Sequence, residues 1–532
     1  MLLALGVLMV TMLLGAAVFT AVQGDAALTR TDLNGKQAYA AAQAGAQAYL
    51  YQLNSNASNS AWWENCANDT AGQSPASPVS VPGSTTGETY SYQPVFANGA
   101  TTCSVTNPVA SLIDQNTGTL RIAFTGHSGT GGQAESRTVV ASFRTLSPLS
   151  FLWYTKYETE DISIDSTDHC DRFYFQNPGP GANCVINWVT GDHMNGPMYT
   201  QDQFYVEAGN SPTFGRAGSN DQIASQVPSN DNSSEICASD NCSGATVDGS
   251  ALSTTPNNAA PDVTPQVPLP ADNSNLLTDA TNHGQVYTGT VTLTLTSDGK
   301  ANGWDCTSAT VCTPIVGLAL ATNPIIYAQN ASGGACTAGY APTSITYPQS
   351  GTYPGAYYGP CGDIYVSGTY STPLTIAAQN DVIVTGNLLN STDTNPGGTA
   401  SPTGPATLGL VADQYVRVKH GCTGNPNVTI DGAILTLAHS FFVDNYSCGG
   451  TALGTLTVHG AIAQDFRGIV GELGGQAWNS GGYYKNYNYD DRLGIILPPY
   501  LFDLQNTQWT VFRETLCSTG STTIASSCSA PS

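Results

Sequence analysis

Carboxylate side chains are the most concentrated reactive groups in this sequence. Between residues 149 and 183 they surround His169 and Cys170, at positions Glu158, Glu160, Asp161, Asp165, Asp168 and Asp171. Oxygen ligands at short spacing suit a hard cation such as Ca²⁺, for which Glu160, Asp161, Asp165 and Asp168 are the candidates. The stretch lacks the Asp-x-Asp-x-Asp-Gly loop of a calcium site. We therefore expect a solvated acidic connector over 149–183 and no cofactor, with Ca²⁺ as the alternative.

A second set of residues could support cleavage of polysaccharides, which requires paired carboxylates several ångströms apart, often beside His or Arg. The candidates are Asp413, Asp431, Asp444 and Asp465, with His420, His439, His459 and Arg467. They are single residues on separate predicted strands, so turn and surface roles are the alternative. The seven histidines are scattered, which argues against a zinc site. We expect no catalytic residue and no enzyme.

The segment GHSGTGG (126–132) resembles a serine nucleophile elbow only superficially. It lacks the final glycine of the G-x-S-x-G pattern, and it lies between two strand-like runs rather than between a strand and a helix. We expect a turn.

The fourteen cysteines predict disulfides formed outside the cytoplasm. No Cys-x-x-Cys spacing occurs, which argues against zinc ribbons and haem attachment. Locality along the chain suggests seven neighbour pairs, although connectivity does not follow from sequence. These pairs are Cys66–Cys103, Cys170–Cys184, Cys237–Cys242, Cys306–Cys312, Cys336–Cys361, Cys422–Cys448 and Cys517–Cys528.

Short runs rich in Val, Ile, Leu and Thr predict the elements that position these groups. Three alternating runs, 89–96, 119–125 and 136–143, predict a small antiparallel sheet. Later runs, separated by Gly, Asn and Asp, favour a parallel β-helix over an alternating sandwich. They are 184–189, 203–206, 286–295, 363–366, 374–377, 381–384, 408–418, 428–437 and 454–459. Polar segments 207–285 and 307–360 are expected to be loop insertions.

One long helix is predicted for residues 1–54. Residues 1–23 are an apolar run with no charge before Asp25, and at 1.5 Å per residue they span about 34 Å, enough to cross a bilayer core. Residues 24–54 contain no proline and place Tyr39, Ala42, Ala46 and Tyr49 on one face. A secretory signal peptide would carry basic residues before the apolar run, and none is present.

The overall charge argues against nucleic acid as a partner. The chain has 15 Lys+Arg against 38 Asp+Glu and a net charge of -23 at pH 7. Such a surface repels phosphate backbones. Ordinary solubility of a secreted protein explains the acidity, with cation binding as the alternative.

Three segments resemble the type IV pilin superfamily, in particular large bacterial pilin-like proteins. They are GDAALTRTDLNGKQAYAAAQAGAQAYLYQLN (24–54), RTVVASFR (137–144) and GYYKNYNYDDRLGIILPPYLF (482–502). Pilins usually carry glutamate at the fifth mature position and phenylalanine at the first, and here these residues are Leu5 and Met1. A minor or tip subunit is therefore an alternative to a major one.

The resemblance implies a structural subunit of an extracellular, pilus-like filament that polymerises through its N-terminal helix. The implied partners are copies of itself, the inner membrane before assembly and the pilus assembly machinery, with surface glycans as candidate ligands. The residues implied in polymerisation are Met1, Leu2, Leu3, Leu5, Val7, Leu8, Val10, Leu13, Leu14, Val18, Phe19 and Val22. The alternative is a membrane-anchored surface protein whose β-helix binds or cleaves polysaccharide.

Together these observations predict an α+β chain. The expected parts are a long helix (1–54, apolar over 1–23 and amphipathic over 24–54), a β head (55–148), an acidic connector (149–183), a β-helix-like body with loop insertions (184–478) and an aromatic-rich C-terminal segment (479–532).

Overall fold

The computed structural model describes most of the chain. Outside the described residues lie 1, 56–60, 67–73, 76, 98, 106–107, 115–118, 132–133, 146, 165–166, 208, 219–220, 222, 226–245, 248–249, 252–267, 309, 333–335, 337–358, 422–426, 448–453, 475–476, 495, 502–508 and 518–532. For 2–28, 61, 64, 109–110, 145, 246–247, 250–251, 307–308, 472–474, 477–480 and 512 only the backbone element is described. The chain divides into two units: Met1–Leu146 with Gln508–Ser532, which we call the head, and Ser147–Thr507, which we call the body.

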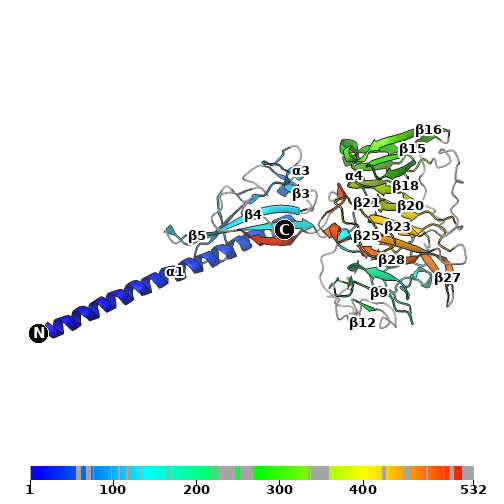
Figure 1. Ribbon diagram of the computed structural model, residues 1–532. Coiled ribbons are helices and arrows are strands. Elements are labelled where there is room, and N and C mark those ends of the chain that lie inside the picture. The colour runs from blue at the N-terminus through cyan, green and yellow to red at the C-terminus, as the bar shows by residue number, and fades with distance from the viewer. Residues whose placement is uncertain are drawn as a thin grey trace. The chain divides into compact units, whose positions relative to one another are not determined.

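The head consists of one long helix packed on an antiparallel sheet (Figure 1). Helix α1 spans Leu2–Ser55, and the sheet has the order β1-β2-β4-β5-β29, with β3 paired to β4. The remaining bounds are α2 (Ala61–Glu64), β1 (Val79–Ser80), β2 (Thr89–Pro94), α3 (Pro108–Leu112), β3 (Ile113–Asp114), β4 (Thr119–Ser128), β5 (Glu135–Thr145) and β29 (Trp509–Leu516).

The body is almost entirely β-structure. Its strands are β6 (Trp153–Tyr157), β7 (His193–Asn195), β8 (Met198–Thr200), β9 (Thr213–Phe214), β10 (Ile223–Ser225), β11 (Thr246–Val247), β12 (Ser250–Ala251), β13 (Gln285–Thr288), β14 (Val291–Thr296), β15 (Lys300–Ser308), β16 (Val311–Ala319), β17 (Ile325–Gln329), β18 (Ile364–Tyr370), β19 (Leu374–Ala378), β20 (Val382–Asn390), β21 (Leu408–Ala412), β22 (Val416–Val418), β23 (Val428–Thr436), β24 (Phe441–Val443), β25 (Thr455–Phe466), β26 (Gly471–Gly474), β27 (Ala477–Gly482) and β28 (Tyr484–Tyr489). One helix, α4 (Ser274–His283), precedes β13.

Most strand pairs in the body are parallel, and among the described residues they follow three ladders. The first has the order β13-β17-β19-β21-β23-β25-β6-β8-β10. The second has the order β14-β18-β20-β22-β24. The third joins the first halves of β23 and β25 to β28, β7, β9 and β11. At one end, β14, β15 and β16 pair antiparallel.

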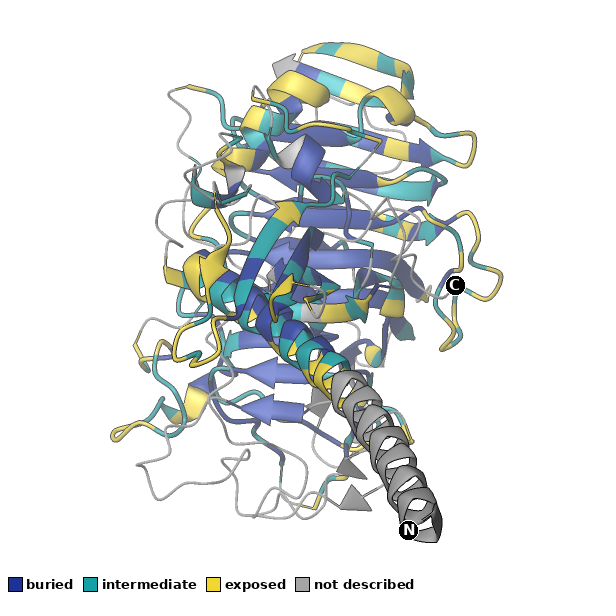
Figure 2. Cartoon of the chain, turned by 90° about the vertical axis from the view of Figure 1, so that its left-hand side faces the viewer, coloured by how far each residue is buried: buried dark blue, intermediate teal, exposed yellow. Residues whose placement is uncertain are grey.

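Aligned apolar side chains form the core of the body. In the first ladder the register places one buried residue from each strand above the next, in the order Ile326, Ile376, Leu410, Ile434, Ile462, Trp153, Met198 and Ile223. Figure 2 shows this burial as dark blue along the strands. Because burying one such side chain contributes about 1.5–3 kcal/mol, a row of this length is a large stabilising term.

The chain enters the first ladder in its middle. Strand β6 pairs with β8 on one side and with β25 on the other, although β25 lies some 300 residues later. After β10 the chain resumes at β13, at the opposite end of the ladder, and returns strand by strand to β25. Eight steps of about 4.8 Å make this a distance of about 38 Å. Residues 252–273 between β12 and α4 can reach about 70 Å when extended, which is sufficient.

Buried ion pairs join the two parts of the chain where β6 meets β25. Arg467 Nη1 lies 3.2 Å from Glu158 Oε2, and both side chains are fully buried. Glu158 also accepts hydrogen bonds from the indole N–H groups of Trp153 (2.9 Å) and Trp188 (3.0 Å). A second pair, Lys485 Nζ to Asp192 Oδ1 at 2.8 Å, joins β28 to the segment before β7. We call these two ion pairs the seam.

The α+β prediction, with a long N-terminal helix and a mostly β body, is confirmed. The runs predicted at 363–366, 374–377, 381–384, 428–437 and 454–459 correspond to β18, β19, β20, β23 and β25. Run 408–418 is divided into β21 and β22, and run 286–295 into β13 and β14. The regions 184–189 and 203–206 contain isolated bridges, Thr159 to Val185 and Trp188 to Val206, rather than strands.

The prediction of a solvated connector over 149–183 is wrong for residues 149–161, which are mostly buried, whereas most of the described residues from 162 to 183 are partly or fully exposed. Glu158 and Asp161 are 0% and 1% exposed, and β6 lies inside the first ladder. The composition of the segment suggested solvation because the sequence does not show Arg467, which compensates the charge of Glu158 from a distant part of the chain.

Two further regions differ from expectation. The segments predicted as loop insertions, 207–285 and 307–360, contain α4, β16 and β17. The predicted C-terminal segment 479–532 is shared, because β28 belongs to the body and β29 pairs with β5 in the head.

We expect Arg467→Met to lower the free energy of unfolding of the body by about 3–5 kcal/mol, because Glu158 would remain buried without its cation. Urea denaturation followed by tryptophan fluorescence would measure this, since Trp153 and Trp188 contact Glu158. The matched control is Lys300→Met, whose pair with Asp298 is exposed and should contribute less than about 1 kcal/mol. Equal effects of the two substitutions would contradict the assignment.

Candidate functional site

Small residues let α1 approach the sheet closely. Ala38, Ala41, Ala42 and Ala46 are buried beneath the strands. On β4, a Cβ at Gly126 would lie 2.0 Å from the carbonyl oxygen of Ala38, so no larger residue fits without moving the helix. Gly126 was predicted to open a turn, but β4 continues to Ser128 and pairs with β5 up to Glu135.

Aromatic rings fill the wider part of the helix–sheet interface. Tyr49 of α1 is 2% exposed, and its ring contacts those of Trp62, Tyr92, Phe124 and Phe143 at centroid distances of 5.0, 5.2, 5.6 and 5.3 Å. Burial raises the pKa of Tyr49 well above its ordinary value. Each such aromatic pair contributes about 0.5–1.5 kcal/mol beyond its buried area, so this cluster fixes the C-terminal half of α1.

Strand β29, which follows the body in the sequence, is hydrogen-bonded to the C-terminal end of α1. The side chain of Asn54 accepts a hydrogen bond from the backbone N–H of Trp509 (2.7 Å) and donates one to its carbonyl oxygen (3.0 Å). Because Trp509 pairs with Thr145, the chain leaves the head and re-enters it at adjacent positions of β5 and β29. The body is thus an insertion between two neighbouring strands of the head sheet.

Among the residues of α1 whose side chains are described, burial begins at Gly35, and none of residues 29–34 is buried. Figure 1 shows the helix continuing past the sheet toward its N-terminus. The side chains predicted to polymerise, from Met1 to Val22, lie outside the described residues. In the part of the chain that is described, no helix is both long and apolar enough for a membrane span; the apolar run 1–23 is outside that part.

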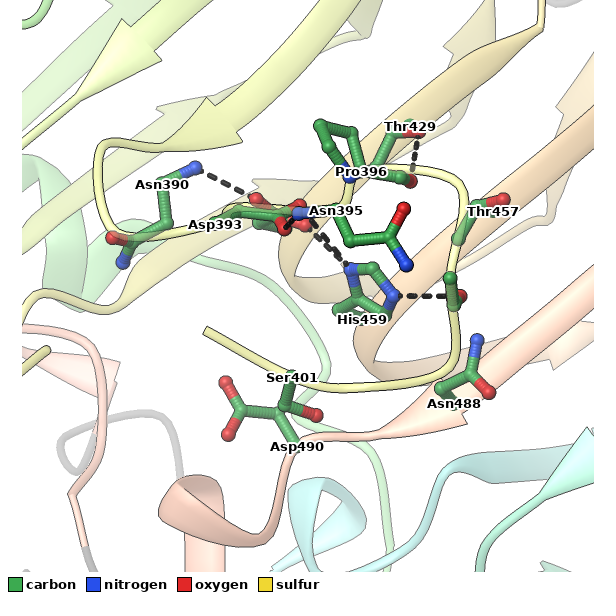
Figure 3. A network of polar contacts seen from close by, with 12 residues as sticks. Asn390, Asp393, Asn395, Pro396, Ser401, Thr429, Thr457, His459, Asn488 and Asp490 are labelled. Atoms are coloured by element: carbon green, nitrogen blue, oxygen red, sulfur yellow. Dashed lines mark hydrogen bonds and ion pairs between the residues drawn. The ribbon is translucent and has the colours of Figure 1, made fainter. Parts of the chain in front are cut away.

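Two of the candidate residues for polysaccharide cleavage, Asp431 and His459, lie close together in the body. Beside them lies Asp393, which the sequence analysis did not identify. His459 Nδ1 lies 2.8 Å from Asp431 Oδ1 and 3.7 Å from Asp393 Oδ2 (Figure 3). Asp393 lies in the segment STDTN after β20, whose composition is typical of a turn, so no signal in the sequence pointed to it.

Burial and neighbouring groups shift the pKa values of Asp431 and His459. Burial raises the pKa of Asp431. Burial opposes a charge on His459, but its hydrogen bonds with Asp431 and with the carbonyl of Gly398 outweigh that effect and raise its pKa. These side chains can therefore hold a proton or a metal cation between the imidazole of His459 and the carboxylates of Asp393 and Asp431.

A second polar cluster brings together three of the candidate residues at a less buried position. His439 Nδ1 lies 2.9 Å from Asp161 Oδ2, and Asp465 Oδ1 lies 3.3 Å from Lys156 Nζ. The side chains of His439 and Asp465 are 18% and 15% exposed. Burial raises the pKa of Asp465, and the neighbouring Lys156 opposes that shift.

The other candidates are held apart in structural roles. Asp444 is fully buried beside Arg417, and Asp413 accepts a hydrogen bond from the backbone of Asn273. Burial raises the pKa of Asp413 to about 7. Burial lowers the pKa of His420, which contacts the backbone of Asn445. Arg467 belongs to the seam.

The candidate calcium ligands have separate partners. Asp161 accepts from Ser163 and contacts His439. Asp168 accepts from the backbone N–H of Asn183. Glu160 is partly buried, and Asp165 lies outside the described residues.

Four of the predicted cysteine pairs form disulfides: Cys66–Cys103, Cys170–Cys184, Cys306–Cys312 and Cys336–Cys361. Cys517 is also disulfide-bonded. Cys237, Cys242, Cys422, Cys448 and Cys528 lie outside the described residues.

The chain is similar to some solved structures, but not to any protein-family model or curated protein. No protein-family model matches the chain, and no curated protein matches it. Among the solved structures that do match is the crystal structure of the competence-associated pilin ComZ from Thermus thermophilus. The alignment covers 91% of this chain and 98% of that chain, with 11% sequence identity and a TM-score of 0.30.

We expect Gly126→Ala to displace α1 from the sheet and to lower the stability of the head by about 1–3 kcal/mol or more, because the added methyl group meets helix backbone rather than a movable side chain. Hydrogen exchange of the α1 amides would report the loss. Gly397→Ala is the control, since a Cβ there meets nothing within 4 Å. Unchanged protection of α1 in Gly126→Ala would contradict the described packing.

Proposed function

We propose that this chain is a structural subunit of an extracellular filament of the type IV pilus kind. The observation that carries the proposal is that the two halves of α1 differ in sequence and in surroundings. Its C-terminal part is covered by the head sheet from Gly35 onward, whereas the sequence before Asp25 is an uncharged apolar run. In this proposal the run is the polymerisation element and the chain has no catalytic role.

The hydrophobic effect supplies the driving force. Fully burying one Leu or Val side chain contributes about 1.5–3 kcal/mol, so an apolar run of this length is strongly unfavourable in water. Before assembly, the inner membrane would cover it, since a helix of about 34 Å matches the bilayer core. In the filament, the same residues of neighbouring copies would replace the lipid, with the assembly machinery moving the subunit between the two environments.

The features of the body suit a position on the outside of the filament, in the extracellular space. We propose that its three ladders of parallel strands form a parallel β-helix, in which each coil covers the apolar row of the next. Disulfides such as Cys170–Cys184 suit an oxidising compartment. Because the body is inserted between β5 and β29, the head sheet can support α1 independently of what the body carries.

We expect Leu14→Lys to abolish filaments, because an unpaired ammonium in an apolar bundle costs several kcal/mol per subunit. Electron microscopy of sheared surface material would measure this. The matched control is Leu33→Lys on the same helix, where the side chain is already 52% exposed. Wild-type protein that stays monomeric without detergent, or Leu14→Lys filaments of normal abundance, would contradict the proposal.

One observation favours a second candidate function, a polysaccharide-binding or polysaccharide-cleaving body. Next to Lys156 and Asp465, the rings of Phe466, Tyr157, Phe173 and Phe175 stack in succession at centroid distances of 4.8, 4.7 and 5.1 Å. Tyr157 and Phe173 have both ring faces covered by their neighbours and Phe466 is buried, so a sugar ring would pack on the end ring, Phe175. Asp465 with its raised pKa could serve as an acid beside Asp161 and His439.

The second candidate predicts that Asp465→Asn abolishes release of reducing sugar from a bacterial polysaccharide panel, while Asp298→Asn leaves it unchanged. Binding without turnover, lost in Phe175→Ala, would restrict this function to recognition. The absence of both binding and turnover in the wild-type protein would exclude it.

A further inference from the structure

Three acceptor atoms converge beneath the segment that follows β20. They are Asp393 Oδ2, Asp431 Oδ1 and His459 Nδ1, which lie within 4.8 Å of one another. The side chains are 2%, 1% and 0% exposed. The three residues come from different coils of the body: Asp431 lies on β23, His459 on its parallel neighbour β25, and Asp393 in the loop after β20.

A backbone group fixes the outer atom of each of these side chains. The backbone N–H of Asn390 donates to Asp431 Oδ2 (2.7 Å), and that of Asn395 donates to Asp393 Oδ1 (2.8 Å). His459 Nε2 lies 3.1 Å from the carbonyl oxygen of Gly398 (Figure 3). A carbonyl oxygen only accepts, so Nε2 carries a proton and Nδ1 is the atom directed inward.

This arrangement is the outer shell expected around a bound metal ion. Metal-binding histidines usually donate their second ring N–H to a carbonyl or carboxylate, and metal-binding carboxylates are usually hydrogen-bonded at the free oxygen. Asp393 Oδ2 adds an independent observation. It is buried, has no hydrogen-bond partner among the residues that the structure describes, and lies 3.7 Å from His459 Nδ1.

The charges also favour a cation. When both buried carboxylates are ionised beside a neutral imidazole, the group carries two negative charges. Arg492, whose charge acts on Asp431, is engaged by Asp490 at 2.6 Å. A proton on Nδ1 would leave one negative charge uncompensated, whereas a divalent cation neutralises the group.

We propose that Asp393, Asp431 and His459 bind one divalent cation of the zinc class. One nitrogen and two carboxylate oxygens suit Zn²⁺, Co²⁺ or Mn²⁺ better than Ca²⁺, which takes six to eight oxygens. Zn²⁺ lies about 2.0–2.2 Å from such donors, which places tetrahedral donors about 3.4 Å apart. The observed separations of 2.8 and 3.7 Å lie on either side of that value.

The cation would fasten the loop after β20 to two coils of the body. The loop is closed at its base by the bond from Asn390 Nδ2 to the carbonyl of Ala406 (2.8 Å). Asn486 of β28 holds it at the carbonyl of Gly398 (3.0 Å). The three protein donors would leave the fourth tetrahedral position to a water molecule. The assigned role is structural, because the donors are buried and the loop covers them.

The test uses the full chain, stripped with a chelator and titrated with Zn²⁺ and separately with Co²⁺. We expect uptake of one ion per chain, a rise in melting temperature with Zn²⁺, and a visible Co²⁺ spectrum of tetrahedral type. Asp393→Asn should weaken binding by at least about a hundredfold, since it removes a direct ligand. This variant should fold, because Asp393 Oδ2 has no hydrogen bond to any described residue that the substitution would remove.

Two controls separate this site from adventitious binding. Asp298→Asn removes an exposed carboxylate beside Lys300 and should leave affinity and stoichiometry unchanged. His459→Gln should abolish the Co²⁺ spectrum even if Asp393→Asn proves unstable. Wild-type protein without stoichiometric uptake, or equal affinity in wild type and Asp393→Asn, would overturn the proposal and leave a proton between the three side chains.

Discussion

The buried charges of the seam are the interaction on which the architecture of the body depends. Glu158 and Arg467 are separated by 309 residues, yet they meet without solvent where β6 joins β25. Taking two ions out of water costs several kcal/mol each, and the pair recovers that energy only with close geometry and added hydrogen bonds. Two indole N–H groups supply hydrogen bonds to Glu158. The pair therefore penalises any register in which β6 meets a different strand, which apolar contacts alone would tolerate.

The connection to the head explains why the seam lies in the middle of the ladder. Strands β5 and β29 are neighbours, so the inserted body must begin and end at adjacent points of the head. A linear stack of strands would begin at one end and finish at the other, roughly 40 Å apart at about 4.8 Å per strand. In the observed order the first strand of the body, β6, pairs with β25, and the last described residues of the body, Pro499 and Leu501, contact β19 and β21, so both lie away from the ends of the ladder. The crossing between β12 and α4 is the consequence of that order.

Local features of the fold could be predicted from the sequence, whereas long-range pairings could not. The helix, the three head strands and most later strands follow from periodicity and composition, which are properties of short windows. Neighbouring cysteines such as Cys306 and Cys312 could be paired because they are close in sequence. The burial of Glu158 and the contact of Asp393 with His459 depend on partners 309 and 66 residues away, and no local pattern encodes them.

The distribution of basic residues links the body's interior to its surface. The chain has only 15 Lys and Arg residues, and several of them are used inside the body. The side chains of Arg467, Arg417, Lys485 and Arg492 are 0%, 8%, 12% and 16% exposed, each beside a carboxylate. Each of these cations is paired with a carboxylate that is itself buried, so the interior pairs cancel and the net charge of -23 is left to the rest of the chain. If subunits polymerise, the result is a polyanionic filament whose neighbours repel one another at low ionic strength and approach when salt screens that charge.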